Sequence, residues 1–219
     1  MSDAQLQLKV GQDIPRSETE GDHAYMKGSK RGELCVVDFF TEMALEGRGF
    51  QVRAGTITTP LVGDVVVTDT AAELCVDVAS GFAAILAYLN IAVRLGTGTL
   101  HEYALKSVDA ISTVGAAFIP LSIIMDTNAT AARSTARVAA AGGVTVTAEL
   151  ATTTRRHWAA SNPVAVGAGH SLTTHVYQPR CAPVIANVAC GYVQIAATGT
   201  GPSYYASLDF LELLWSQIS

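Results

Sequence analysis

The chain has 219 residues, of which 49% are hydrophobic and 15% are charged, and its formal net charge is −5. This length gives one large domain or two small ones, and a core of that size needs neither a disulfide nor a metal to hold it together. The acidic balance argues against a protein whose main role is to grip nucleic acid, because phosphate neutralisation requires a basic face or tail.

The first 33 residues are polar and rich in glycine, with few apolar side chains. This composition predicts an N-terminal arm that becomes ordered only where something docks onto it. Its densest basic cluster consists of Lys27, Lys30 and Arg31, which we interpret as candidate contacts to nucleic acid, with a solvated loop as the alternative. Neither a signal peptide nor an apolar run of about 20 residues that could span a bilayer is apparent.

Residues 34–46 fit either a short helix or a strand. Helical spacing is met by four apolar residues, Val36, Phe39, Phe40 and Met43. Gly47 and Gly49 then end the element. We favour a short helix within an arm that covers residues 1–49, followed by a single domain over residues 50–219.

From Phe50 onward Thr, Val, Ile and Ala dominate, and turn residues interrupt them at short intervals. The longest candidate strand lies within residues 82–95. Its side chains alternate from Tyr88 on. One face carries Leu89, Ile91, Val93 and Leu95, and the other carries Tyr88, Asn90, Ala92 and Arg94. This period of two predicts a long central strand with one face on a core.

Ten candidate strands share this texture. They cover residues 50–59, 64–68, 73–79, 84–95, 102–111, 117–126, 143–150, 171–178, 184–197 and 203–215. No helix of useful length lies between them, so we predict an all-β sandwich or barrel. The exception is the Ala-rich stretch 127–140, for which we predict one or two helical turns.

Patterns for catalysis and metal binding are weak. The chain has no Gly-x-Ser-x-Gly or Ser-x-x-Lys motif. A metal site of His170, His175 and Cys181 is disfavoured, because residues five apart lie on opposite faces of a strand. We therefore expect no enzyme activity, no cofactor and no metal.

The four cysteines are Cys35, Cys75, Cys181 and Cys190, which are spread too widely for a metal knuckle or a CxxC redox pair. We expect them to be reduced and mostly buried, as small hydrophobic residues usually are. One disulfide between two of them stays open, because its pairing does not follow from the spacing.

Arg155, Arg156, His157 and Trp158 form the one concentrated mixture of cations and an aromatic ring. Trp and Arg are enriched at the energetic centres of protein interfaces, so we interpret these four residues as a candidate interface. The alternatives are contact with phosphates and an unpaired base, or an ordinary loop.

The low charge content also points to an interface. Soluble domains average about 25% charged residues, well above the 15% of this chain. A permanent interface over much of the exterior would explain the difference, and so would a cavity for a hydrophobic ligand. Of the two we favour the interface.

The order of these features along the chain is itself informative. The polar arm precedes an Ala/Thr/Val/Gly-rich sandwich, and the long strand Leu86–Leu95 is joined by Gly96–Thr99 to the next. A final strand, Tyr204–Trp215, runs almost to the end. This layout resembles the single jelly-roll capsid proteins of small icosahedral viruses, although the arm is less basic than the Arg-rich tails with which some of them package RNA.

The resemblance implies an all-β jelly-roll sandwich of about eight to ten antiparallel strands, with an N-terminal arm and short helical insertions. It implies a structural protein that is made in the host cytoplasm and resides in the virion. Its partners would be copies of itself, other capsid proteins and, to a modest extent, the viral genome.

Two other classes remain open. One is a trimeric jelly-roll receptor-binding or ligand domain, as in spike tips or tumour-necrosis-factor-like proteins. The other is a β-barrel enzyme or carrier such as a cupin, for which the sequence shows no clustered His and Glu ligands.

Overall fold

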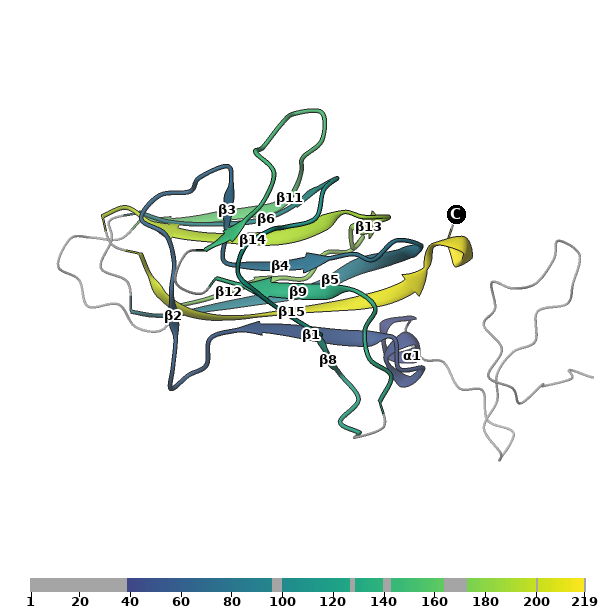
Figure 1. The fold of residues 1–219 in the computed structure, drawn as a ribbon. Coiled ribbons are helices and arrows are strands. Elements are labelled where there is room, and N and C mark those ends of the chain that lie inside the picture. The colour runs from purple at the N-terminus through teal and green to yellow at the C-terminus, as the bar shows by residue number, and fades with distance from the viewer. Residues whose placement is uncertain are drawn as a thin grey trace, which may run out of the picture.

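The structure is a computed structural model, and it describes residues 39–95, 100–126, 129–139, 143–163, 173–199 and 201–218. Within these ranges its regular secondary structure is almost entirely strand (Figure 1). The helical elements are α1, Phe39–Leu45, and the 3-10 helix η2, Trp215–Gln217. The strands are β1 Gly49–Ala54, β2 Leu61–Val62, β3 Ala71–Ala72, β4 Leu74–Asp77, β5 Phe82–Leu95, β6 Leu100–Val108, β7 Ala116–Phe118, β8 Leu121–Ser122, β9 Thr135–Val138, β10 Val144–Thr145, β11 Arg155–Pro163, β12 Thr173–Tyr177, β13 Val184–Ala186, β14 Cys190–Ala197 and β15 Ser203–Leu214.

The strands form two sheets and a two-stranded ribbon, and every pairing between named strands is antiparallel. The seven-stranded sheet has the order β12-β5-β15-β1-β8, with β13 added to β5 and β2 added to β15. The six-stranded sheet has the order β11-β6-β14-β4-β9-β7, and β10 pairs with β3 in the ribbon. The two sheets lie in layers one above the other (Figure 1). The predicted all-β sandwich is therefore confirmed.

Four of the pairings are nested. Among the eight strands β1, β4, β5, β6, β11, β12, β14 and β15, β1 pairs with β15, β4 with β14, β5 with β12 and β6 with β11. The first strand thus pairs with the last, the second with the second-last, and so on inward. The chain is arranged as one long hairpin of four strands out and four strands back, wrapped around a common core.

Strand β5 is the central element that the sequence predicts. It pairs with β15 on one side and with β12 and β13 on the other. Leu89 and Ile91 are fully buried in the core between the sheets, while Arg94 is exposed, so the predicted alternation is confirmed there. Ala87 has no partner between the paired Leu86 and Tyr88, and this bulge keeps Leu86 before it and Leu89 after it on the core face.

The core between the two sheets is apolar and closely packed. Each sheet contributes alternate residues of its long strands, for example Val193 and Ile195 of β14 facing Leu208 and Phe210 of β15. A second, smaller cluster covers the outer face of the six-stranded sheet: Ala72, Cys75, Val108, Val144, Val146, Cys190 and Tyr192. The six-stranded sheet is therefore buried on both faces near β4 and β14.

Some local predictions are wrong. The stretch 127–140 contains strand β9 where helical turns are predicted, because its residues pair with β4, with Ala136 fully buried opposite Val76. Of the predicted strand 64–68 only a single bridge at Asp64 is present, and 143–150 is a strand only at Val144–Thr145.

Two further predicted strands are divided. The stretch 117–126 holds two short strands, β7 and β8. The stretch 184–197 is interrupted at Asn187 and Val188, whose φ angles of 52° and 51° are left-handed, so that β13 and β14 enter different sheets.

The helix expected over 34–46 is present as α1; residues 34–38 lie outside the described part. Cys75 and Cys190 are free and buried, as expected, but Cys181 is exposed, since it follows β12 in a connection at the surface. Cys35 lies outside the described residues.

Gly63, which follows β2, and Gly201, which precedes β15, lie in close backbone contact. A Cβ atom at Gly201 would overlap the backbone carbonyl oxygen of Gly63, an atom that cannot rotate away. We expect Gly201→Ala to lower the free energy of unfolding by about 3 kcal/mol or more, the upper part of the range for overpacking. Gly199→Ala adds its methyl group in open space and should cost only the roughly 1 kcal/mol of a left-handed φ. Urea unfolding of both variants measures the difference, and equal losses would contradict the expectation.

Candidate assembly surface

Helix α1 is held to the sandwich by few contacts. Met43 is its one buried side chain and packs against Leu211 of β15. The helix ends at Leu45, and two residues later Gly47, with a left-handed φ of 77°, donates its N–H to the carbonyl oxygen of Ala44 at 2.9 Å. Leu45, in its last turn, is 71% exposed. A helix this short cannot bury a full face, so it presents apolar side chains to the outside.

Strand β8 forms an edge of the seven-stranded sheet. It pairs with the start of β1, where Leu121 lies opposite Gln51 and Ser122 opposite Phe50. Within the described residues it is the outermost strand on that side of the sheet. An outermost strand leaves backbone N–H and C=O groups that another strand can pair with.

The segment around β8 carries its large apolar side chains outward. Every second residue is an exposed hydrophobic one: Ile119 is 57% exposed, Leu121 58%, Ile123 42% and Met125 102%. We call these four residues the apolar row. Between them, Pro120 is buried. The usual arrangement, with apolar residues on the core and polar residues in water, is inverted here, and contiguous exposed apolar surface marks a contact site.

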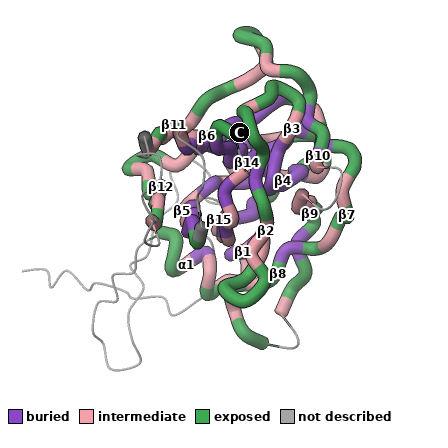
Figure 2. The backbone as a smooth tube through the Cα atoms, turned by 90° about the vertical axis from the view of Figure 1, so that its left-hand side faces the viewer, coloured by how far each residue is buried: buried purple, intermediate pink, exposed green. Residues whose placement is uncertain are grey.

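The apolar row and α1 are neighbours. A Cβ atom at Gly49, the first residue of β1, would lie 3.1 Å from Cδ1 of Ile123 and 3.2 Å from Ala44 of α1. Both elements therefore converge on the start of β1, and they lie on the same side of the sandwich (Figures 1 and 2). Phe39 and Phe40, 40% and 38% exposed, extend the apolar surface along α1.

The predicted nucleic-acid contacts Lys27, Lys30 and Arg31 lie outside the described residues. Their role stays a prediction.

The predicted interface set Arg155, Arg156, His157 and Trp158 lies on β11, at the edge of the six-stranded sheet. A bulge separates its members, because Arg156 pairs with Lys106, Trp158 pairs with Leu105, and His157 has no partner. Arg155 and Arg156 are exposed, whereas the Trp158 ring packs inward, 6.2 Å from the ring centre of Tyr177. The four side chains therefore do not form one surface.

His157 is not a third cation beside the two arginines at neutral pH. Its Nε2 lies 2.8 Å from Oγ of Ser107. Burial, together with the positive charge of Arg155, lowers the pKa of His157 below its usual value. The exposed charge of the set therefore comes from the arginines alone.

Arg156 belongs to a charge network on the outer face of β6 and β11. Its Nη2 lies 3.4 Å from Oε1 of Glu149, whose other oxygen accepts a hydrogen bond from Nζ of Lys106. The hydrogen bond from Lys106 lowers the pKa of Glu149. Lys106, Arg156 and Ser161 line an open depression of about 300 Å³ beside this network.

The two members of the ion pair differ in burial, since the side chain of Lys106 is 4% exposed and that of Glu149 is 27% exposed. Glu149→Ala leaves a buried ammonium without its carboxylate and should cost about 3 kcal/mol, as broken buried pairs do. Lys106→Met leaves a carboxylate that water can reach, and should cost less than about 1.5 kcal/mol. Urea unfolding at pH 7 compares the two variants, and the reverse order would contradict this reading.

The loss in Glu149→Ala also depends on pH. Because the pKa of Glu149 is lowered in the folded protein, its stabilising effect is present above the unfolded pKa and is lost as the pH falls through the folded one. We therefore expect the difference in free energy of unfolding between the wild type and Glu149→Ala to become smaller at acidic pH.

The disfavoured histidine metal site is not assembled by the described residues. His170 lies outside them, the ring of His175 stacks 4.3 Å from that of Tyr103, and Cys181 is exposed.

Comparison with known proteins places the chain in no family. No family model matches it, and searches of curated proteins and of solved structures found no match. Among the described residues, no helix is long and apolar enough to cross a membrane. The proposals below therefore depend on the geometry of this molecule.

The apolar row lies in the predicted strand 117–126 but is not a predicted interface. The signal is present, because Ile119, Leu121, Ile123 and Met125 alternate with other residues. Alternation shows only that these side chains share a face of an extended segment. Whether that face meets the core or the outside depends on where the segment joins the sheet.

Proposed function

We propose that the chain is a structural protein whose sandwich is a jelly roll, and that copies of it assemble through several interfaces into a closed icosahedral viral shell around a genome. The protein would have no catalytic role. It would reside in the virion after synthesis in the host cytoplasm.

The nested strand pairing supports the jelly roll. Eight antiparallel strands in two sheets, paired first with last and inward in turn, give the two Greek keys of that architecture. Jelly rolls serve viral capsids, lectins and cupins alike, so the fold by itself supports the shell only by analogy. The choice among these functions has to come from the surface.

The apolar row is the single observation that carries the assembly proposal. Four large hydrophobic side chains point outward from a segment at the edge of a sheet, next to the exposed Phe39, Phe40 and Leu45. A fully exposed side chain of this size gains about 1.5–3 kcal/mol on burial, and a half-exposed one gains about half of that. The small net charge of −5 opposes association only weakly.

A second copy of the chain is the simplest occupant of this edge. Identical subunits that meet through the same or complementary patches form closed symmetric assemblies, in which each subunit gains several contacts at once. Arg155 and Arg156, on the edge strand of the other sheet, would take part in a second interface. Lys27, Lys30 and Arg31 would supply the modest contact to the genome.

Size-exclusion chromatography with light scattering tests the proposal on purified protein at tens of micromolar. We expect a particle with many times the 22.9 kDa of one chain. A clean monomer would contradict self-assembly. A species of three chains would favour a trimeric receptor-binding or ligand domain over a shell.

A further inference from the structure

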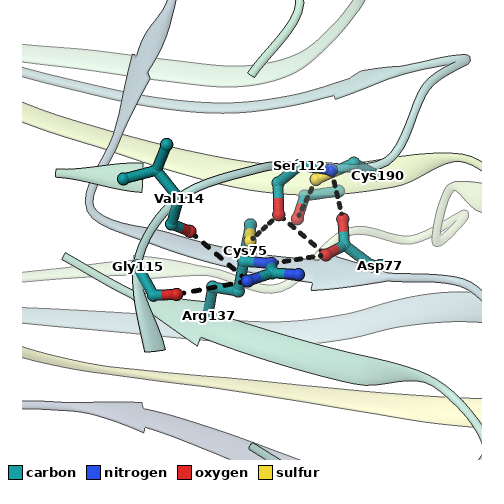
Figure 3. A network of polar contacts seen from close by, with 8 residues as sticks. Cys75, Asp77, Ser112, Val114, Gly115, Arg137 and Cys190 are labelled. Atoms are coloured by element: carbon teal, nitrogen blue, oxygen red, sulfur yellow. Dashed lines mark hydrogen bonds and ion pairs between the residues drawn. The ribbon is translucent and has the colours of Figure 1, made fainter. Parts of the chain in front are cut away.

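Two cysteines and an aspartate meet on the outer face of the six-stranded sheet, away from the apolar row. Cys75 and Asp77 are two residues apart on β4 and so point the same way, and Cys190 of β14 lies opposite Asp77 in the strand register. The thiol sulfurs and a carboxylate oxygen all lie within 4.8 Å of one another. The three side chains converge in Figure 3.

The cluster is closed to solvent. Both cysteines are fully buried and Asp77 is 6% exposed, beneath apolar residues that include Val108 and Val144. Both thiols are free. A buried thiol is ordinary, but a buried carboxylate is unusual unless it is paired or binds an ion. The residue types are the ones that bind zinc, an ion of borderline softness that accepts Cys sulfur and Asp oxygen together.

The spacing also fits one ion. Zinc binds sulfur at about 2.3 Å and carboxylate oxygen at about 2.0–2.2 Å, so donors to a single ion lie within roughly 4.6 Å of one another. The separation of the three donors, within 4.8 Å, requires only small movements. We propose that Cys75, Asp77 and Cys190 bind a structural zinc ion.

Ser112 and Arg137 complete the site (Figure 3). The Ser112 N–H donates to Oδ1 of Asp77 at 2.7 Å, its hydroxyl donates to Oδ2 at 2.7 Å, and its oxygen lies 3.0 Å from Sγ of Cys75. The Ser112 oxygen thus lies beside two of the three donors and would serve as the fourth ligand, while its N–H holds the carboxylate in place.

The charges balance with the ion bound. Nε of Arg137 lies 3.4 Å from Oδ2 of Asp77, and its Nη1 donates to the carbonyl oxygen of Gly115 at 3.2 Å. Without metal, the arginine balances the carboxylate. With Zn²⁺ bound, each thiol gives up its proton, and the two thiolates balance the ion while the arginine still balances Asp77. The buried site thus gains no net charge on binding.

Such an ion would tie three segments together. Cys75 and Asp77 belong to β4, Cys190 to β14, and Ser112 to the connection between β6 and β7 that covers the outer face. Because a preformed site does not exist in the unfolded chain, the free energy of zinc binding would add to the stability of the folded protein.

The experiment measures zinc in the full-length protein, purified without chelators from zinc-supplemented cultures. We expect about one zinc ion per chain, in keeping with a single closed site. The matched control is the Cys35→Ser/Cys181→Ser variant, which keeps only the thiols of the site and should retain the zinc. The Cys75→Ser/Cys190→Ser variant should lose it, and Asp77→Asn should hold it more weakly in competition with a chelator.

Cobalt provides a readout that does not require the cysteine variants of the site to fold. After exchange with Co²⁺, the wild type and the control variant should both show thiolate-to-cobalt charge-transfer bands and the visible bands of a tetrahedral ion. The proposal is overturned if folded wild type takes up neither ion, if the Cys75→Ser/Cys190→Ser variant keeps its zinc, or if the purified wild type contains a Cys75–Cys190 disulfide.

Discussion

Replacing Glu73 with glutamine should stabilise the protein at alkaline pH by up to about 5 kcal/mol. Glu73 lies between β3 and β4, is 3% exposed, and accepts a hydrogen bond from the Ile195 N–H at 2.8 Å. Burial is the main cause that raises its pKa to about 8, and the nearby negative charge of Asp64 adds to it. The folded protein therefore keeps this carboxyl protonated at neutral pH, and glutamine imitates that neutral form.

The direction of the effect follows from proton linkage. The pKa of Glu73 is about 8 in the folded protein, against an ordinary value of 4.5. The folded state therefore binds the proton more tightly. The contribution of Glu73 to stability is complete below pH 4.5 and is lost as the pH rises through about 8. The two pKa values differ by about 3.5, and each pKa unit corresponds to about 1.4 kcal/mol, so glutamine can stabilise the protein by at most about 5 kcal/mol.

Urea unfolding between pH 5 and pH 9 tests this prediction. The wild type should lose stability across the range, and Glu73→Gln should lose much less. Glu73→Ala is the control, since it removes the same titration but leaves the Ile195 N–H unpaired, at a cost of about 1–3 kcal/mol at every pH. If the free energies of unfolding of the wild type and Glu73→Gln changed equally with pH, this would contradict a buried, protonated Glu73.

Placing arginines in the apolar row should abolish assembly while leaving the subunit folded. Leu121 and Met125 are 58% and 102% exposed, so their replacement by arginine disturbs little of the subunit core. We expect the free energy of unfolding of the Leu121→Arg/Met125→Arg subunit to stay within about 1 kcal/mol of the wild type. A contact that buries the row, however, would have to bury two unpaired charges in each copy.

The size of the assembly effect can be estimated from the same numbers. Met125 is fully exposed and Leu121 about half exposed, so together they lose about 2–5 kcal/mol of burial, and one contact weakens by roughly 30-fold or more, since 1.4 kcal/mol corresponds to tenfold. Light scattering over a range of protein concentrations measures the concentration at which the copies associate in each variant. Leu150→Arg, at a residue 53% exposed and outside the row, is the control. Equal losses in both variants would show that the row has no special role.

The long strands could be predicted from the sequence because their periodicity is set by burial. In β15, Ala206, Leu208 and Phe210 are buried while Ser207 and Asp209 are partly exposed, as their alternation predicts. In β5 the alternation before Tyr88 is broken by the bulge at Ala87. No residue type in this stretch indicates that bulge. Strong amphipathic strands therefore follow from local sequence, whereas their defects depend on the neighbouring strand.

The short strands and both sites could not be predicted in the same way. Strand β9 lies in an Ala-rich stretch that also suits helical turns, and it is held as a strand by its pairing with β4 and β7. Cys75 and Cys190 are far apart in sequence, and only the pairing of β4 with β14 brings them together. The outward direction of the apolar row likewise follows from its place beyond β1, at the edge of the sheet.

Electron microscopy of the purified protein tests self-assembly most directly. If copies of this sandwich build a closed shell, images should show hollow particles of uniform diameter, and the Leu121→Arg/Met125→Arg variant should show none. A field of single molecules or of compact trimers in the wild type, under conditions where the protein is folded, would contradict the shell.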